Sequence, residues 1–299
     1  MHPAPLVELE YATKRFGALE ALAGLDFRIS RGELVALLGP NGAGKLTAVA
    51  LMLGLQAPSS GSVRLFGEPP RSIAARRRIG VMMQEVGLNP TLRTRELLDL
   101  VSSYYPDPLP ISASIAAAGI EALAERPYGK LSGGQKRQVQ FAMAICGRPE
   151  LIFLDEPTVG LDVSARERMW LTLRGLVRDG ASIVLTTHYL EEAEALASRV
   201  AVLVRGQLVA DGSVGEIRAL VSRKRISCIS KIPAEEIRHW SGVESATLEG
   251  EQLSLVVTNA DAVVRRLVQS DESLKDLEVR RAGLAEAFVD SHGSLHNGR

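Results

Sequence analysis

The sequence predicts an α/β fold with a largely parallel sheet, followed by a small α+β domain. Three observations support this prediction. Compact apolar runs of strand length alternate with helical stretches through most of the 299 residues, which is the pattern of a parallel sheet with crossover helices. A glycine-rich loop directly follows one of these runs and opens a helix. The composition then changes after about Leu220, around the basic segment SRKR.

The N-terminal elements are predicted to include both antiparallel and buried strands. Residues Val7–Ile29 alternate like two antiparallel strands. Glu33–Leu38 is a compact apolar run, as expected of a strand that is buried on both faces. The helix after the glycine-rich loop is expected over Lys45–Leu55. Two short strands are predicted at Val63–Phe66 and Ile79–Met83.

A helical region is expected in the middle of the chain. The pattern from about residue 93 to residue 124 is helical, but Pro106, Pro108 and Pro110 interrupt it, because prolines cannot lie inside one helix. The remaining elements alternate between helix and strand. They are a helix at Ser132–Cys146, a strand at Leu151–Leu154, a helix at Val163–Val177, a strand at Ile183–Thr186, a helix at Leu190–Ala197 and a hairpin over residues 200–212.

Residues 225–290 are predicted to form a small α+β domain after a first domain of residues 1–220. The order of its expected elements is that of a split βαβ module. They are a strand at Arg225–Ser230, a helix at Pro233–Trp240, a hairpin across Gly250, a helix at Ala260–Val268 and a strand at Leu277–Arg281. Residues 291–299 are polar and are expected to be a flexible tail.

Bulk composition argues against several classes of protein. Lys and Arg total 35, as do Asp and Glu, so the chain lacks the basic excess of dedicated nucleic-acid binders, and we expect no nucleic-acid partner. No apolar run approaches the roughly 18–20 residues that span a bilayer, and no secretory signal is expected. The two cysteines, Cys146 and Cys228, lack a metal-type spacing, which predicts a reduced, cytosolic chain.

The segment GPNGAGKLT, residues 39–47, has the features of a phosphate-binding loop. It follows a predicted buried strand and opens a helix, the context that such a loop requires. Glycines allow a tight path in which N–H groups point at phosphate oxygens, and the helix N-terminus adds partial positive charge. Lys45 would reach the β- and γ-phosphates. The predicted nucleotide-binding residues of this loop are Asn41, Gly42, Ala43, Gly44, Lys45, Leu46 and Thr47.

One position departs from the phosphate-loop pattern. The pattern has Ser or Thr directly after the lysine, because that hydroxyl ligates Mg²⁺, whereas this chain has Leu46. Thr47 lies one residue further along the helix, about 100° away around its axis, and is not expected to replace the missing ligand cleanly. Mg²⁺ usually keeps several waters, so the loss of one protein ligand is tolerable, but an apolar side chain is a poor neighbour for a metal ion.

Further motifs follow in a fixed order along the chain. They are Gln84 after the strand IGVMM, LSGGQ at residues 131–135, LIFLDEPT ending in Asp155, Glu156, Pro157 and Thr158, GLD at residues 160–162, and His188 after the strand SIVLTT. Together with the phosphate loop, this ordered set resembles the ABC ATPase family over about residues 6–215. The resemblance implies a P-loop NTPase core of the ABC type, with an antiparallel β subdomain and a helical subdomain over about residues 88–148.

The resemblance also implies roles in ATP hydrolysis, which needs a metal ion, a positioned water and charge stabilisation at the γ-phosphate. Asp155 would ligate Mg²⁺ directly or indirectly, and Glu156 would act as general base on the attacking water. His188 would hold the γ-phosphate and the water in line, and Gln84 would contact the metal and the water. Phe16 resembles the aromatic residue that stacks on adenine; the alternatives are that it is a half-buried strand residue or that Tyr11 stacks instead.

The LSGGQ motif implies a dimer. In the family, the residues corresponding to Ser132, Gly133 and Gly134 contact the γ-phosphate that is bound to the opposite subunit. Gln135 is predicted to bind nucleotide with them, and Asp162 would lie at that interface. One chain has one phosphate loop and one LSGGQ motif, so two chains, as a homodimer or with a paired ATPase subunit, would make two composite ATP sites. By the same resemblance, the helical subdomain and the Gln84 loop would receive an integral membrane permease subunit.

The chain most resembles subunits of drug, polysaccharide and antibiotic exporters. This resemblance implies a location at the cytoplasmic face of the membrane. FLDEPTVGLD and the C-terminal arrangement of Leu284, Glu286 and Phe288 carry this resemblance. Two other interpretations stay open. One is a degenerate ATP-binding module with slow turnover, which Leu46 supports. The other is a soluble ABC protein that acts on ribosomes or DNA, against which the single ATPase domain counts.

Overall fold

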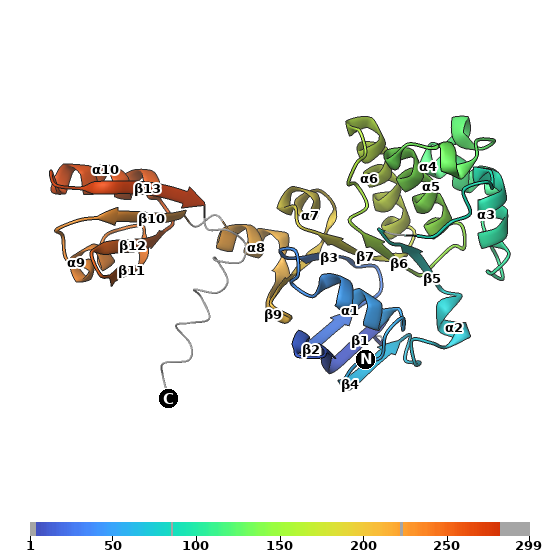
Figure 1. The fold of residues 1–299 in the computed structure, drawn as a ribbon, viewed down its shortest axis with the longest axis horizontal. Helices are drawn as coiled ribbons and strands as arrows, with labels where there is room; N and C mark the ends of the chain where they lie inside the picture. Colours follow the sequence, from blue (N-terminus) through green and yellow to red (C-terminus); the bar gives the residue numbers. More distant parts are fainter. Residues whose placement is uncertain (1–3, 85, 222–223, 282–299) are drawn as a thin grey trace. The chain divides into compact units, whose positions relative to one another are not determined.

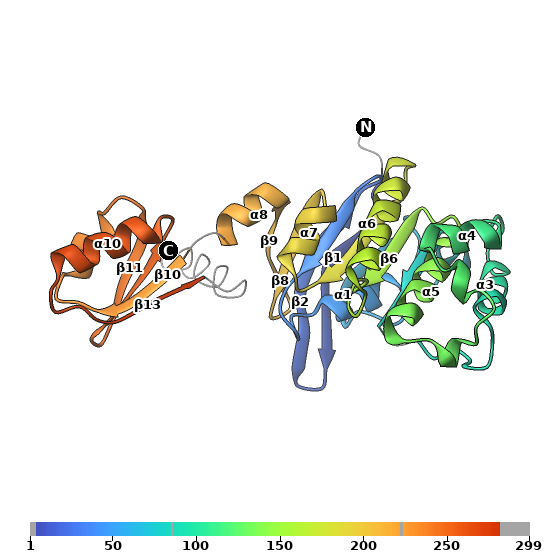
Figure 2. The same ribbon diagram turned by 90° about the horizontal axis from the view of Figure 1, so that it is seen from above.

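The computed structural model describes residues 4–84, 86–221 and 224–281. The chain divides into two compact units, residues 1–214 and residues 215–299. Figure 1 and Figure 2 show the elements of both units in two views.

A six-stranded sheet forms the centre of the first unit, with the strand order β5-β6-β7-β3-β8-β9. Its strands are β5 (Ile79–Met82), β6 (Leu151–Asp155), β7 (Ser182–Thr187), β3 (Leu34–Leu38), β8 (Arg199–Val204) and β9 (Gln207–Ser213). All pairings are parallel except that of β8 with β9. Every residue of β3, β6 and β7 is buried, which explains why these segments are continuous apolar runs.

Helices connect the parallel strands. Because parallel neighbours require a crossover, β3 leads into α1 (Lys45–Met52), and β6 leads through a loop into α6 (Val163–Arg178). The next crossover contains α7 (Leu190–Leu196), which packs against β3 and β7. Parallel strands place their carboxyl ends at one edge of the sheet, so the loops after β3, β6 and β7 meet there.

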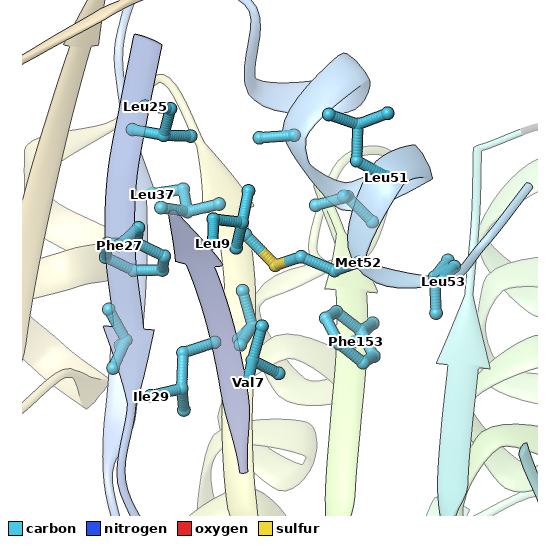
Figure 3. Close-up of a cluster of buried hydrophobic side chains, with 14 of the residues drawn as sticks. Val7, Leu9, Leu25, Phe27, Ile29, Leu37, Leu51, Met52, Leu53 and Phe153 are labelled. Atoms are coloured by element: carbon cyan, nitrogen blue, oxygen red, sulfur yellow. The ribbon is translucent and has the colours of Figure 1, made fainter. Parts of the chain in front are cut away.

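A three-stranded antiparallel sheet with the order β2-β1-β4 completes the core of the first unit. Its strands are β1 (Val7–Phe16), β2 (Leu19–Ile29) and β4 (Ser60–Leu65). Figure 3 shows Leu9 and Val7 of β1 toward Met52 of α1 and Phe153 of the central sheet, with Phe27 of β2 in the same cluster. The burial of these apolar side chains joins the two sheets through α1.

Helices fill the segment between β5 and β6. They are α3 (Thr94–Ser102), α4 (Ile111–Ala118) and α5 (Gly133–Ile145), with short 3₁₀ turns at Glu121–Leu123 and Tyr128–Lys130. Pro106 and Pro108 lie between α3 and α4, and Pro110 is the N-cap of α4, in agreement with the predicted interruption. Tyr105 donates its hydroxyl hydrogen to Ile79 O at 3.0 Å, and burial raises the pKa of Tyr105 to about 12.

The second unit contains a four-stranded antiparallel sheet with the order β11-β12-β10-β13. Its elements are β10 (Lys224–Ile229), α9 (Ala234–Arg238), β11 (Val243–Glu249), β12 (Gln252–Val257), α10 (Ala260–Ser270) and β13 (Lys275–Arg281). This is the βαββαβ order that the sequence predicted. Trp240, Leu255 and Leu267 lie in its apolar core.

Some details differ from the sequence-based expectations. Helix α1 ends at Met52 and not at Leu55, because Gly54 adopts a φ of 65° that ends the helical path. Two helices were not predicted, α2 (Ile73–Arg76) and α8 (Val214–Val221). Leu284, Glu286 and Phe288, as well as residues 291–299, lie outside the described residues. Within the described part of the chain, no helix combines the length and apolar character that a membrane span requires.

Candidate nucleotide-binding site

The loop between β3 and α1 follows the tight path that phosphate binding requires. Gly42 and Gly44 have φ values of 77° and 102°, which residues with a Cβ atom rarely adopt. A Cβ on Gly39 would lie 2.3 Å from Leu203 O, and one on Gly44 would lie 2.6 Å from Ala21 O. Neighbouring backbone therefore allows only glycine at these two positions, which fixes the course of the loop.

Lys45 is the buried cation of this loop. Its Nζ donates hydrogen bonds to Gly39 O at 2.6 Å and to Pro40 O at 3.0 Å. Burial lowers the pKa of Lys45, although the charges of Glu156 and Asp155 oppose this effect. The loop's own carbonyls thus hold the ammonium group beside the cleft, where it can exchange them for phosphate oxygens.

Two carboxylates lie where β6 ends. Asp155 Oδ1 accepts a hydrogen bond from Thr186 Oγ1 of β7 at 2.5 Å. The next residue, Glu156, has a φ of 44°, and its N–H donates to Thr186 O at 3.1 Å. A left-handed φ on a non-glycine residue costs about 1 kcal/mol or more and is frequent at functional sites. The positive φ ends the extended backbone of β6 directly after Asp155, where Glu156 lines the cleft.

Glu156 brings the other predicted catalytic residues together. Gln84 Nε2 donates to Glu156 Oε2 at 2.7 Å, and His188 Nδ1 lies 2.9 Å from Glu156 Oε1. Arg137 of α5 donates to Met83 O at 3.2 Å, which ties the loop after β5 to the helical segment. Gln84, Glu156 and His188, from three different loops, therefore form one hydrogen-bonded group.

These side chains and the phosphate loop line a cavity of about 670 Å³. Every residue that we predicted around the phosphate loop lines it, as do Gln84, Asp155, Glu156 and His188. Phe16 also lines it and is 45% exposed, whereas Tyr11, at 69% exposure, is not among the lining residues. The half-exposed ring of Phe16, which lines the cavity, suits stacking on a base better than that of Tyr11.

Sequence reasoning missed four lining residues, Leu19, Glu20, Ala21 and Arg205. Arg205 lies in the two-residue turn between β8 and β9, where it and Gly206 have φ values of 49° and 76°. Gly206 N donates to Ala43 O at 2.9 Å, and this bond places the turn against the phosphate loop. The signal in the sequence was an arginine at a hairpin position that favours Asn, Asp or Gly.

Ser132, Gly133, Gly134 and Gln135 of the LSGGQ motif line a second cavity, of about 630 Å³, together with Asp162. Ser132 is the N-cap of α5; its Oγ accepts from Gln135 N at 3.3 Å. A Cβ on Gly134 would lie 2.6 Å from Gly160 O, so the start of α5 lies close against the loop after β6. Asp162 caps α6 by accepting a hydrogen bond from Ala165 N at 2.8 Å. No described residue lines both cavities.

Comparison with known proteins agrees with this geometry. Residues 22–159 match the family described as ABC transporter. A Nod factor export ATP-binding protein I from Paraburkholderia xenovorans is 35% identical over 96% of this chain and 97% of its own length. The chain belongs to the ABC transporter family of ATP-binding proteins. A daunorubicin resistance ATP-binding protein from Streptomyces coeruleorubidus is 33% identical to this ABC protein over 96% of both chains.

Solved structures show the same ABC ATPase fold. The ATP-binding subunit of an ABC transporter aligns with a TM-score of 0.66 and 28% identity, over 71% of this chain and 92% of that protein. An ATP-binding cassette that was solved as a dimer in a post-hydrolysis state with ADP and Pi aligns with a TM-score of 0.64 and 27% identity, over 70% of this chain and 98% of that one. This chain is accordingly an ATPase of the ABC family.

The family also implies Mg²⁺, and the cleft offers it few protein oxygens. Leu46 lines the cleft with 51% exposure, at the position where the phosphate-loop pattern has a hydroxyl. Asp155 and the Gln84 side-chain oxygen remain as potential ligands, and no group of three metal-binding His, Cys, Asp or Glu side chains occurs among the described residues. This donor set fits Mg²⁺ that is held mainly by water and phosphate oxygens.

Proposed function

We propose that this ABC ATPase powers an exporter by closing a two-subunit sandwich around ATP, at the cytoplasmic face of a membrane and in complex with an integral permease subunit. The names of its relatives, which concern export of Nod factor and resistance to daunorubicin, support export. The observation that carries the ATPase mechanism is the group formed by Gln84, Glu156 and His188 beside the phosphate loop. We expect no nucleic-acid partner.

Each residue of the cleft has a chemical role in this proposal. Phe16 stacks on the adenine, and the loop N–H groups and Lys45 bind the phosphates. Glu156 accepts a proton from the attacking water, because its carboxylate lies at the cleft and is only 14% exposed. His188 and Gln84 orient that water and the γ-phosphate, and for this they release the hydrogen bonds that now join them to Glu156.

A bound Mg²⁺ would neutralise charge on the β- and γ-phosphate oxygens. Asp155 and Gln84 are the residues that would hold it. Leu46 contributes no oxygen, so we infer that the site binds the metal weakly and that ATP turns over slowly. A degenerate module that binds ATP and dimerises would show the same slow turnover, because the remaining groups of the cleft are in place.

The separation of the two cavities supports a dimer. The cleft with Lys45 and the cavity with Ser132 share no described lining residue, so one chain offers two separate halves of an ATP site. In a head-to-tail pair, with a second copy or with a paired ATPase subunit, the α5 N-terminus of one chain meets the phosphate loop of the other. The N–H groups at that N-terminus then face the γ-phosphate.

Mg-ATPase activity of the purified chain beside its Leu46→Ser variant tests the proposal. Both proteins should bind ATP with similar affinity, and the serine variant should hydrolyse ATP several-fold faster because it regains a metal ligand. Thr47→Val tests whether Thr47 supplies the missing ligand instead; little change in rate is expected, because its hydroxyl lies about 100° away around the helix axis. Equal and substantial rates for the wild type and Leu46→Ser would refute the account of the metal site, and a large loss in Thr47→Val would assign the missing ligand to Thr47.

A further inference from the structure

Glu192 is a buried carboxylate that the mechanism above does not use. It lies on α7, is 4% exposed and does not line the nucleotide cleft. Its neighbour Glu191, on the same helix, is exposed. A carboxylate loses hydration when it is buried, so a buried one needs compensating hydrogen bonds.

The Thr158 hydroxyl supplies one such hydrogen bond. Thr158 Oγ1 donates to Glu192 Oε1 at 2.8 Å. The Thr187 side chain also lowers the pKa of Glu192, against the larger effect of burial, and Thr187 Oγ1 accepts from Tyr189 N at 3.0 Å. The charged groups that act on Glu192 are Glu156 and Arg166; burial is the main reason that the pKa of Glu192 is raised.

Glu192 and Thr158 belong to the two segments that carry the predicted catalytic residues. Thr158 follows Glu156 by two residues, and Glu192 follows His188 by four. The Glu192–Thr158 hydrogen bond therefore adds a cross-link between these segments, beside the bonds of Thr186 with Asp155 and Glu156 and of His188 with Glu156. Neither Glu192 nor Thr158 lines the cleft, so nucleotide would leave this link intact.

The loop that Thr158 anchors continues into the second cavity. Leu161 N donates to Thr158 O at 3.1 Å, and Val159, Gly160 and Leu161 line the cavity of the LSGGQ residues. Gly160 O lies against Gly134 at the start of α5. A shift of the loop at Thr158 therefore moves the wall of the second cavity as well as the backbone that bears Glu156.

We propose that Glu192 is a positioning residue that holds the Glu156–Asp162 loop and the His188 loop in register, and thereby couples the two half-sites of one chain. The proposal rests on the proposed two-site ATPase mechanism. In this proposal, the Glu192–Thr158 hydrogen bond fixes the position of Glu156 relative to His188. It also fixes the position of Gly160 relative to the helix that begins at LSGGQ.

Hydrogen exchange and steady-state ATPase kinetics test the proposal on the full chain, with Glu192→Ala, Glu192→Gln, Thr158→Val and the control Glu191→Ala. In Glu192→Ala, the amides of Val159 and Leu161 should exchange faster, while those of the phosphate loop should not. We expect kcat to fall about tenfold with KM changed less than about twofold. Glu192→Gln keeps an acceptor oxygen and should recover most of both properties.

The link is specific if Thr158→Val reproduces the effect of Glu192→Ala and the double variant is no worse than Glu192→Ala alone. Faster exchange throughout the first unit, or equal exchange and kinetics in Glu192→Ala and Glu191→Ala, would overturn the proposal. If the wild type itself failed to hydrolyse ATP, the proposed function would fail, and the exchange experiment would still decide the role of Glu192.

Discussion

Two groups of loops in this protein are organised by carboxylates, and they use them differently. In the second unit, Asp271 accepts hydrogen bonds from Ser230 Oγ, Lys231 N, Ser273 N and Ser273 Oγ at 2.6–2.9 Å. The Ser273 hydroxyl, with the other donors, holds the pKa of Asp271 well below its usual range. In the first unit, the Glu156 side chain is bonded to Gln84 and His188, and all three line the open nucleotide cleft.

We infer that the difference separates a structural carboxylate from a catalytic one. The partners of Asp271 are backbone groups and short hydroxyl side chains from its own turn and from the loop after β10, so its hydrogen bonds join these two segments and leave the carboxylate with no acceptor capacity to spare. The partners of Glu156 are longer side chains that can move away, and the φ of 44° at Glu156 shows that its backbone is held under strain. We infer that a carboxylate whose hydrogen bonds are all satisfied within the fold contributes to stability. A carboxylate on strained backbone beside a cleft is inferred to take part in chemistry.

The largest expected effect concerns Glu156 itself. Glu156→Gln should lower ATP turnover by about 10²–10⁴-fold, since the amide cannot accept the proton of water. ATP affinity should stay nearly unchanged, because the phosphate loop is untouched. Turnover by purified protein and equilibrium binding of ATP measure the two quantities. Retention of more than half of the activity would show that Glu156 is not the base.

The second effect concerns Lys45. Lys45→Ala should weaken ATP binding by about tenfold to a hundredfold, which corresponds to the loss of about 1.5–3 kcal/mol from a charged hydrogen bond. The thermal midpoint without nucleotide should not fall, because the variant no longer buries an ammonium group whose pKa is already lowered by burial. Thermal unfolding with and without ATP checks both expectations. A large loss of stability without ATP would make Lys45 a structural residue like Asp271.

The third effect concerns Asp271, the structural carboxylate of the comparison. Asp271→Ala should lower the stability of the second unit and leave ATP binding unchanged, because four donors lose their acceptor. Denaturant unfolding, followed beside the exposed control Asp261→Ala, measures this effect. A variant that bound ATP more weakly but unfolded normally would assign Asp271 to function.

The smallest effect concerns Glu150, which accepts from Arg78 Nε and Nη2 and from Arg31 Nη1. Arg78 in the first place, and then Arg31, lowers the pKa of Glu150 to about 2. A lowered acid pKa stabilises the folded state above the ordinary value of 4.5, and this contribution disappears as the pH falls toward 2. Because the side chain is 37% exposed, screening limits the contribution to about 1 kcal/mol.

Glu150→Gln should therefore unfold more easily than the wild type at neutral pH and should approach it as the pH falls below 4. Urea unfolding of the two proteins at a series of pH values gives the comparison. An equal difference in unfolding free energy at pH 7 and at pH 3 would exclude this ionic contribution.

The sequence predicted those site residues whose positions follow from the local backbone conformation. The glycines at Gly42 and Gly44, the acids at the end of β6 and the serine cap of α5 all occupy positions that a local rule determines. Arg205 and Glu192 were missed because their roles depend on partners far along the chain. Arg205 reaches the cleft through the packing of its turn on Ala43, and Glu192 contacts Thr158 across 34 residues.

We propose that one chain carries two separate halves of an ATP site, which only a second chain can complete. Sedimentation velocity of the purified protein with and without Mg-ATP tests it most directly, beside a Gly133→Asp variant that places a carboxylate at the start of α5, where a Cβ atom meets nothing within 4 Å. We expect a monomer without ATP, a dimer with ATP, and a Gly133→Asp protein that binds ATP but stays monomeric. A wild type that binds ATP tightly and remains a monomer, or a Gly133→Asp protein that dimerises normally, would contradict this proposal.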